Sequence, residues 1–249
     1  MRFTVLTLFP EISDAYFASS IMAKAVIKGI IGYRAVNIRD FALDKHKTCD
    51  DAPYGGGPGM LMLAEPLSRA LESVGVKKRP DTGFHVIYLT PSGRPFTQKQ
   101  AEELAGMEEL VLICGRYEGI DQRIIDAYVD EELSVGDFVL SSGETAALVV
   151  IDTVYRLVDR VITPQSLEEE SFSGGLLEYP QYTRPEVFDM MEVPEVLLSG
   201  HHENIRRWRL KKRVEKTLVF RPELLERGLR EGLFDAETVK LIEEGMRKP

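Results

Sequence analysis

The feature that most constrains the fold is the alternation of short β-rich runs with helical segments over the first two-thirds of the chain. The β-rich runs cover residues 3–8, 33–38, 85–89, 110–114 and 138–140. Strands that alternate with helices are typical of α/β domains, in which the sheet is mainly parallel. We therefore predict an α/β fold with a mainly parallel sheet.

Capping residues and composition mark the later elements. Thr97 and Gln100 have the spacing of a capping box, and Gly106 suits the C-terminal cap of the same helix. Residues 144–158 are apolar on most faces, which predicts a buried helix packed on the sheet. Residues 164–184 contain three consecutive glutamates, paired glycines and two prolines, which predicts an interdomain linker.

Two domains should flank this linker. Residues 1–163 form the α/β domain, and residues 185–249 form a small, all-helical C-terminal domain. In the second domain Pro222 should begin one helix, and Asp235 should cap the last one.

Charge is distributed unevenly along the chain. The 40 acidic and 31 basic side chains give a formal net charge of −9, which would repel nucleic acid if it were evenly spread. Residues 124–155, however, hold seven acidic side chains and no Lys or Arg, whereas residues 203–216 carry a net charge of +5. The basic segment surrounds the only tryptophan, Trp208, with Arg206, Arg207, Arg209 and Arg213. A solvated helix face would also be basic, but cations mixed with an aromatic ring favour a nucleic-acid contact.

The cysteines and the hydropathy favour a cytoplasmic protein. Cys49 and Cys114 lie far apart and outside any CxxC pattern, so neither a disulfide framework nor a thiolate metal site is predicted. No apolar run approaches the roughly 18 residues of a membrane span, and the N-terminal segment lacks the features of a signal peptide. His85 is predicted to be a core residue, and the run from His201 to Glu203 lacks the spacing of a zinc site.

Residues 54–60, YGGGPGM, form a glycine-rich loop. Such a backbone can approach a ligand closely, although a flexible turn has the same composition. The loop matches neither the GxGxxG pattern nor the phosphate loop that ends in Gly-Lys-Ser/Thr. Because His46, Lys47, Asp50 and Asp51 precede it, we interpret it as a substrate-contacting loop.

Three further loops rich in small residues cover residues 89–93, 114–121 and 134–144. Turn chemistry alone explains any one of them. Ligands of open α/β sheets bind at the carboxyl ends of the strands, so the three loops together predict one pocket. Arg116 and Glu118 lie in the second loop and should pair with each other or with a ligand, because an unpaired buried charge is costly. The Glu118 carboxylate could accept from a guanine edge, and a structural ion pair is the alternative.

Five motifs occur in collinear order: DDAPYGGGPGM (50–60), CGRYEGID (114–121), SVGDFVLSSGE (134–144), SFSGGLLEYPQYTRPEV (171–187) and LLSGHHENIRRWRL (197–210). Together they closely resemble the bacterial tRNA (guanosine-37-N1)-methyltransferase family of the knotted SPOUT class. The resemblance implies a deep trefoil knot that forms the S-adenosylmethionine site, a linker and a helical tRNA-binding domain. It also implies an antiparallel homodimer with active sites at the subunit interface. True knots are nearly absent from proteins, so the knot follows from the resemblance alone.

The resemblance also implies roles for individual residues. Cofactor contacts, mostly through backbone groups, fall on Leu89, Pro91, Gly115, Tyr117, Ile120, Ser134, Val135, Gly136, Phe138, Leu140 and Gly143. The flipped guanine is held near Gly59 and Glu118, and the tRNA contacts His46, Asp50, Ser171, Ser199, His201, Arg206, Arg207 and Trp208. Magnesium is implied as well, at an unknown site.

Methylation at guanine N1 requires a base, because that nitrogen carries a proton at neutral pH. The family places its base directly before a Ser-Phe pair, at Glu170 here, and an arginine that stabilises charge on the guanine oxygen at Arg156. The family usually has aspartate at the base position, so Glu170 reaches one methylene further and Glu169 is a possible substitute. Ser142 also replaces the usual glycine.

The sequence thus predicts a methyltransferase that modifies N1 of guanosine 37, adjacent to the anticodon, in tRNA. Two other functions stay open at this point. One is an RNA-binding protein that has lost turnover through the changes at Glu170 and Ser142. The other is a knotted methyltransferase that acts on ribosomal RNA or on a ribose hydroxyl.

Overall fold

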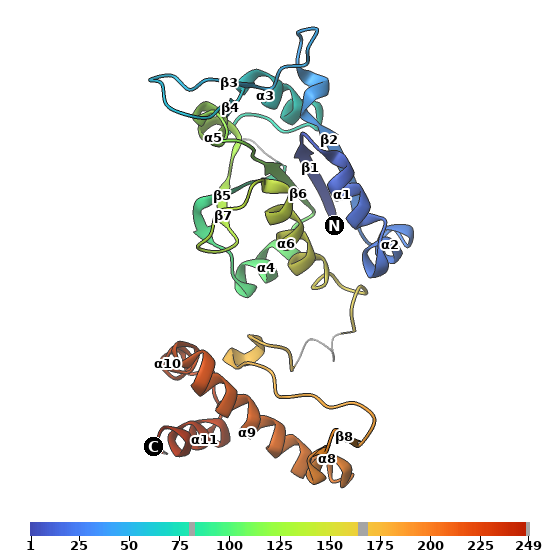
Figure 1. Cartoon of the computed structure of the whole chain (residues 1–249), viewed down its shortest axis with the longest axis vertical. Helices are drawn as coiled ribbons and strands as arrows, with labels where there is room; N and C mark the ends of the chain where they lie inside the picture. Colours follow the sequence, from blue (N-terminus) through green and yellow to red (C-terminus); the bar gives the residue numbers. More distant parts are fainter. Residues whose placement is uncertain (80–82, 164–168, 248–249) are drawn as a thin grey trace. The chain divides into compact units, whose positions relative to one another are not determined.

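A computed structural model describes residues 1–79, 83–163 and 169–247 of the chain. The chain splits into two compact units, Met1–Ile162 and Thr163–Pro249. Figure 1 shows the sheet in the first unit and a group of helices in the second. The start of the predicted linker, residues 164–168, lies outside the described residues.

The first unit is built on a five-stranded sheet in the order β2-β1-β6-β5-β7, in which all neighbouring strands are parallel. The strands are β1 (Arg2–Thr7), β2 (Gly32–Asn37), β5 (His85–Pro95), β6 (Glu109–Cys114) and β7 (Glu131–Ser134). Two short strands, β3 (Asp50–Asp51) and β4 (Leu61–Met62), pair antiparallel outside this sheet. The prediction of an α/β fold with a mainly parallel sheet is confirmed.

Helices cover both faces of the sheet, as Figure 1 shows. One face packs against α1 (Pro10–Phe17), α2 (Ser20–Ile27), α4 (Gln98–Ala105) and α6 (Gly143–Tyr155). The other packs against the 3-10 helix η1 (Ile38–Phe41), α3 (Ala64–Ser73) and α5 (Gln122–Tyr128). In β6, Leu110 and Leu112 enter the first core, whereas Val111 and Ile113 enter the second. A strand covered on both faces is apolar throughout, because successive side chains point to opposite faces.

The predicted helix signals in this unit are confirmed. The Thr97 side chain accepts from the Gln100 peptide N–H, the Gln100 side chain accepts from that of Thr97, and Gly106 is the C-cap of α4. The buried helix predicted over residues 144–158 is α6, which ends earlier, at Tyr155, with Arg156 as its C-cap.

The strand predicted over residues 138–140 is wrong. The strand at this edge of the sheet is β7, in which Glu131 accepts hydrogen bonds from Arg94 and Gln100. The apolar side chains of Phe138 and Val139 are instead 55% and 84% exposed, in the loop that leads from β7 to α6. His85 is also misplaced, because its ring is half-buried beside Glu131 rather than in the apolar core.

The second unit packs its helices around Leu176, Val214, Leu225 and Ile242. Its helices are η2 (Ser173–Gly175), α8 (Glu195–Leu198), α9 (His202–Phe220), α10 (Pro222–Glu231) and α11 (Ala236–Met246). Pro222 begins α10, and the Asp235 carboxylate caps α11 by accepting from the Thr238 peptide N–H at 2.8 Å, so both predicted helix starts are confirmed. A two-stranded hairpin, β8 (Val187–Phe188) and β9 (Met191–Glu192), was not part of the all-helical prediction. Among the described residues no helix is long and apolar enough to cross a membrane.

Candidate functional site

A cavity of about 300 Å³ lies at the ends of β6 and β7 and at the middle of β5, where the pairing with β7 shifts register between Leu89 and Arg94. All three segments that the sequence predicted to form one pocket contribute to its walls, together with Tyr88, Leu133 and Ala146. The prediction of a loop over residues 89–93 is wrong, because these residues lie within β5. Of the eleven predicted cofactor contacts, all line this cavity except Ile120, which is buried and forms a β-bridge with Met62. The volume is at the lower end of the range for small-molecule sites in proteins.

Close approaches between backbones hold the cavity walls together. The Gly143 N–H donates to the Gly115 carbonyl at 2.8 Å, and a Cβ at position 143 would lie 2.6 Å from the Gly115 nitrogen. A Cβ on Gly93 would lie 2.6 Å from the peptide of Glu132 and Leu133. Side chains cannot occupy these positions, so the wall facing a ligand there is main chain. Ser142, by contrast, has extended backbone angles that any residue adopts.

Apolar side chains around the cavity are exposed to solvent. Tyr117 and Phe138 are about half exposed, and Tyr117 has a left-handed backbone with φ of 59°. Exposed apolar groups beside a cavity are a feature of ligand sites, and strained residues concentrate at such sites. Tyr88 lines the cavity, and the sequence analysis missed it. Its hydroxyl, in the otherwise apolar run of residues 86–89, was a signal that could have found it. A Cβ on Gly115 would lie 2.9 Å from the Tyr88 ring, and burial raises the pKa of Tyr88.

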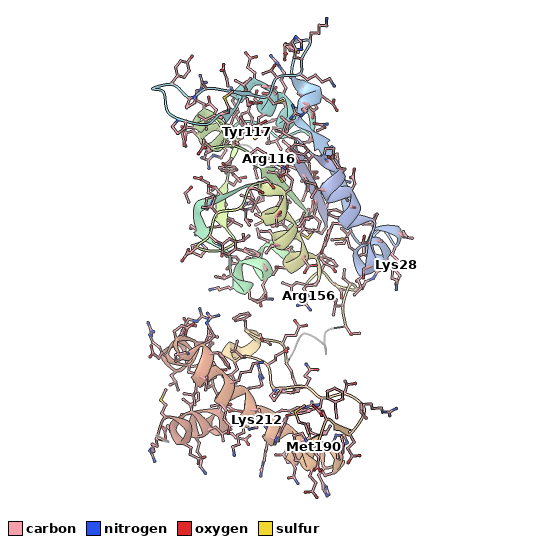
Figure 2. All side chains as sticks on the ribbon, viewed as in Figure 1. Lys28, Arg116, Tyr117, Arg156, Met190 and Lys212 are labelled. Atoms are coloured by element: carbon pink, nitrogen blue, oxygen red, sulfur yellow. The ribbon has the colours of Figure 1, made fainter. Side chains whose placement is uncertain are left out.

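Arg116 pairs with Glu144 of α6 rather than with Glu118. Its Nε atom lies 3.5 Å from Oε2 of Glu144, and its guanidinium carbon lies 4.3 Å from the centre of the Phe9 ring. Glu144 is 1% exposed, and its other oxygen accepts from the Thr7 hydroxyl at 2.5 Å. Arg116 and Tyr117, labelled in Figure 2, directly follow β6. Arg116 therefore forms the structural ion pair, and Glu118 is left for another role.

The glycine-rich loop lies against the second cavity loop. The Glu118 N–H donates to the Met60 carbonyl at 3.0 Å, and the Met62 N–H donates to the Gly119 carbonyl at 3.0 Å. A Cβ on Gly59 would lie 2.4 Å from Cγ of Glu118, so the two predicted guanine contacts are adjacent. The Glu118 side chain is exposed, and no described residue pairs with its carboxylate. His46 and Asp50, which precede this loop, are exposed and half-buried respectively.

The two predicted catalytic residues lie in different units. Arg156 is the C-cap of α6 in the first unit (Figure 2). Glu170 is half-buried in the second unit, where its carbonyl accepts from the Ser173 N–H at 3.2 Å. The Ser171 hydroxyl accepts from the Glu178 N–H at 3.2 Å. These bonds fold residues 170–178 into a tight turn that fixes the backbone of Glu170.

Glu169 is already engaged by its own chain. Its Oε2 atom accepts from the Tyr179 hydroxyl at 2.8 Å and from Nη1 of Arg209 at 3.2 Å. The Arg209 guanidinium carbon lies 4.7 Å from the centre of the Tyr179 ring. This three-residue cluster gives Glu169 a structural role in the second unit.

The four arginines of α9 divide into two sets. Arg206 and Arg207 are exposed and both pair with Glu203 and Glu237, and the hydrogen bond from Arg206 lowers the pKa of Glu203 to about 2. Arg209 and Arg213 are half-buried and bind residues 169–177, through the Glu169 carboxylate and the carbonyls of Ser173 and Leu177. The nucleic-acid contact of this segment stays a prediction, and of its four arginines Arg206 and Arg207 are the exposed ones.

The other predicted tRNA contacts lie near the start of α9. Trp208 is half-buried with its ring 6.4 Å from that of Tyr182. The Ser199 hydroxyl donates to the Val196 carbonyl at 2.8 Å and accepts from the His201 N–H at 3.2 Å, which orders the turn before the helix. Magnesium finds no ligand set in this arrangement: among the described residues, no three His, Cys, Asp or Glu side chains gather closely enough to hold a metal.

A glycine-lined pocket at the carboxyl ends of a parallel sheet is typical of α/β proteins that bind a nucleotide-like ligand. Comparison with protein families matches residues 1–227 to the family described as tRNA (Guanine-1)-methyltransferase TrmD, and the chain belongs to this family. The family resemblance predicted from the five motifs is confirmed, and the protein is an enzyme of this type.

Similar proteins carry the same name. The chain is 65% identical to a tRNA (guanine-N(1)-)-methyltransferase of Treponema denticola over 98% of both chains. It is 58% identical to that of Treponema pallidum over 98% of this chain and 96% of the relative. The protein of the same name from Borreliella burgdorferi is 60% identical over 90% of this chain and 92% of the relative.

Proposed function

We propose that this enzyme transfers the methyl group of S-adenosylmethionine to N1 of guanosine 37, adjacent to the anticodon, in tRNA. Family membership over residues 1–227 is the observation that carries the proposal. The names of the relatives support both the substrate class and the methylated nitrogen. The pocket of the first unit supports a cofactor that is held mainly by backbone groups.

The cavity at the ends of β6 and β7 and the middle of β5 is the proposed cofactor site. Its main-chain wall at Gly115 and Gly143 can offer peptide groups to an adenosine, and the ring of Phe138 offers an apolar surface. When bound, S-adenosylmethionine supplies a methyl group already activated by a sulfonium. The proposal includes the deep trefoil knot that the family resemblance implies. The hydrogen bond between the loops at Gly143 and Gly115 is compatible with it.

Glu118 and Gly59 form the proposed guanine site. The carboxylate of Glu118, unpaired among the residues that the structure describes, can accept hydrogen bonds from the N–H groups on the guanine edge, while Gly59 leaves room beside it. A guanine read on this edge must leave the anticodon-loop stack, as bases recognised by proteins in RNA usually do.

Glu170 is the proposed general base. Its carboxylate removes the proton from guanine N1, so that the nitrogen lone pair can attack the methyl group. Arg156 stabilises the negative charge that develops on the guanine oxygen as this proton leaves. The contacts of Glu169 with Tyr179 and Arg209 argue against Glu169 as the substitute base. The position of Glu170 directly before the Ser-Phe pair supports Glu170. Because magnesium has no ligand set among the described residues, no step is assigned to it.

The exposed arginines of α9, Arg206 and Arg207, are proposed to bind phosphates of the tRNA backbone. Arg206 and Arg207 are paired with Glu203 and Glu237, so a phosphate must replace these carboxylates when tRNA binds. Ser171, Ser199, His201 and Trp208 belong to the same proposed contact surface. We also propose the cytoplasmic homodimer that the sequence predicted, in which active sites lie at the subunit interface.

Methyl transfer to unmodified tRNA transcripts tests this function. Transcripts with guanosine or adenosine at position 37 are incubated with labelled S-adenosylmethionine, and the product nucleoside is identified by mass spectrometry. We expect N1-methylguanosine from the first transcript only. Equal transfer to the second transcript would contradict the proposal, and no transfer to either would favour an RNA-binding protein without turnover.

The base assignment has its own test within the same assay. Glu170→Gln should reduce the single-turnover rate by at least about 10²-fold, the range that general-base catalysis supplies. Affinity for S-adenosylmethionine, measured by calorimetry, should stay within about twofold, because the proposed cofactor site is built from residues of the first unit. Full activity of this variant would exclude Glu170 as the base.

A further inference from the structure

One face of α9 binds the turn that carries Glu170. Arg209, Arg213 and Thr217 follow one another at intervals of four residues and so lie in one stripe along the helix. Each of the three contacts a different part of residues 169–178. The inner stripe, as we call these three residues, is distinct from the exposed pair Arg206 and Arg207.

The inner stripe holds the turn through both side-chain and backbone groups. Arg209 binds the Glu169 carboxylate at 3.2 Å. Arg213 donates from Nη2 to the Ser173 carbonyl at 2.8 Å and from Nε to the Leu177 carbonyl at 3.2 Å. The buried hydroxyl of Thr217 accepts from the Leu177 N–H at 3.0 Å. The turn is thus fixed at its start, its middle and its end.

Apolar packing reinforces these bonds. Leu176 is 3% exposed and packs in the core of the second unit beside Val214 of α9. A Cβ on Gly175 would lie 3.3 Å from the Phe234 ring, so the backbone of the turn lies directly against that side chain. Burial lowers the pKa of Arg213, and its two bonds to carbonyls offset part of that cost.

We propose that the inner stripe positions the catalytic base, and that Glu169, Tyr179 and Arg209 are positioning residues that act through Glu170. Glu170 follows directly after Glu169, which Arg209 holds, and its carbonyl is bonded to Ser173, whose own carbonyl Arg213 holds. A displacement of about 1 Å in a reacting group can cost about 10²-fold in rate. This inference rests on the proposed role of Glu170.

The proposal also links tRNA binding to catalysis. Arg206 and Arg207 precede Arg209 on the same helix, so a phosphate that binds the exposed pair acts on the element that holds the base. Loss of the contacts between the inner stripe and residues 169–178 should lower the rate of methyl transfer. It should leave the affinity for tRNA unchanged, because Arg206 and Arg207 are not altered.

Single-turnover methyl transfer by the full-length enzyme, measured from pH 5 to 9 at saturating tRNA and S-adenosylmethionine, tests the proposal. Glu169→Gln and Arg209→Gln should each lower the maximal rate by about 10²-fold. When the tRNA and S-adenosylmethionine concentrations are varied in turn, the concentration that gives the half-maximal rate should stay within about twofold, because the variants do not change the proposed binding surfaces. The rise of the rate with pH should persist in both variants, because Glu170 still takes the proton.

Two further variants keep the test decisive. Tyr179→Phe removes only the hydroxyl that binds Glu169 and should lower the rate by about tenfold, so it serves where Glu169→Gln fails to fold. Glu244→Gln removes a glutamate that forms an exposed ion pair with Lys240 in the same unit, and it should leave the rate unchanged.

The outcomes separate this proposal from the function on which it rests. Loss of the pH-dependent rise in Glu169→Gln would make Glu169 the base and overturn the positioning role. Unchanged rates in Glu169→Gln and Tyr179→Phe would overturn it as well. Failure of the wild type to methylate the guanosine-37 transcript, or full activity of Glu170→Gln, would instead contradict the proposed function.

Discussion

The cavity of the first unit and the turn at residues 169–178 of the second are built in opposite ways. At the cavity, main chain packs against main chain at Gly143 and beside it at Gly93, where no Cβ fits, and Gly115 packs against the Tyr88 ring. In the turn, charged and polar side chains of α9 hold backbone carbonyls and one carboxylate. The cavity should therefore be most sensitive to added atoms, and the turn to lost hydrogen bonds and charges.

The largest effect that would test this comparison is expected from Gly143→Ala. The new Cβ would lie 2.6 Å from the Gly115 nitrogen and 2.8 Å from Cα of Cys114, and both are backbone atoms that cannot move aside. Overpacking of this kind costs about 1–3 kcal/mol of the free energy of unfolding. We also expect binding of S-adenosylmethionine to weaken by at least tenfold, about 1.4 kcal/mol, in calorimetry.

Gly83→Ala is the matched control, because a Cβ there has open space and the glycine has no positive φ. It should change neither stability nor cofactor affinity. If Gly143→Ala bound S-adenosylmethionine with wild-type affinity, the cavity wall would tolerate an added atom. This result would contradict the contrast between the cavity and the turn at residues 169–178.

A smaller effect is expected from Gly59→Ala. Its Cβ would displace the Glu118 side chain, which is flexible, so the fold should survive while guanine recognition suffers. We expect kcat/KM for tRNA to fall by about tenfold, which is 1.4 kcal/mol of transition-state stabilisation. Steady-state methylation kinetics with varied tRNA measure this change.

Gly56→Ala shows whether a lower kcat/KM in Gly59→Ala comes from backbone strain or from displacement of the Glu118 side chain. Gly56 has φ of 77°, close to the 88° of Gly59, so alanine carries a similar backbone cost of about 1–2 kcal/mol at either position. Gly56 has no neighbour within 4 Å and does not touch Glu118. Equal losses in both variants would refute the role of Glu118 in reading guanine.

The smallest effect is expected from the exposed pair. Neutralising Arg206 and Arg207 to glutamine should weaken tRNA binding and reduce the slope of log K against log salt by about 0.7–0.9 for each lost phosphate contact. Filter binding at several salt concentrations measures the slope. Affinity for S-adenosylmethionine should not change, and an unchanged slope would exclude these arginines from the RNA surface.

Several helix ends could be predicted from the sequence, because they depend on interactions between residues a few positions apart. A capping box needs only Thr97 and Gln100 three residues apart, and the cap at Asp235 needs only its neighbouring peptide N–H groups. The strand at residues 138–140 failed because an apolar run indicates burial but not what buries it. Phe138 lines a cavity, whereas Glu131 lies in the edge strand beside Arg94.

Pairing between distant residues could not be predicted in the same way. The sequence offered Glu118 as a partner for Arg116, yet the partner is Glu144, which α6 brings to the end of β6. The sequence assigns Arg209 and Arg213 to one basic surface with Arg206 and Arg207. Their contacts with residues 169–178 could not be predicted, because the partners lie about forty positions away in sequence.

The sequence by itself determined the α/β class, the family and the segments that form the pocket, because hydrophobic alternation and contiguous motifs are encoded in short stretches of chain. Only the tertiary structure decided which charges remain available to a ligand. An ion pair depends on which elements fold against each other, so Arg116 was assigned to Glu144, and Glu169 to Arg209. The same folding left the Glu118 carboxylate unpaired among the described residues, where the proposed guanine site requires it.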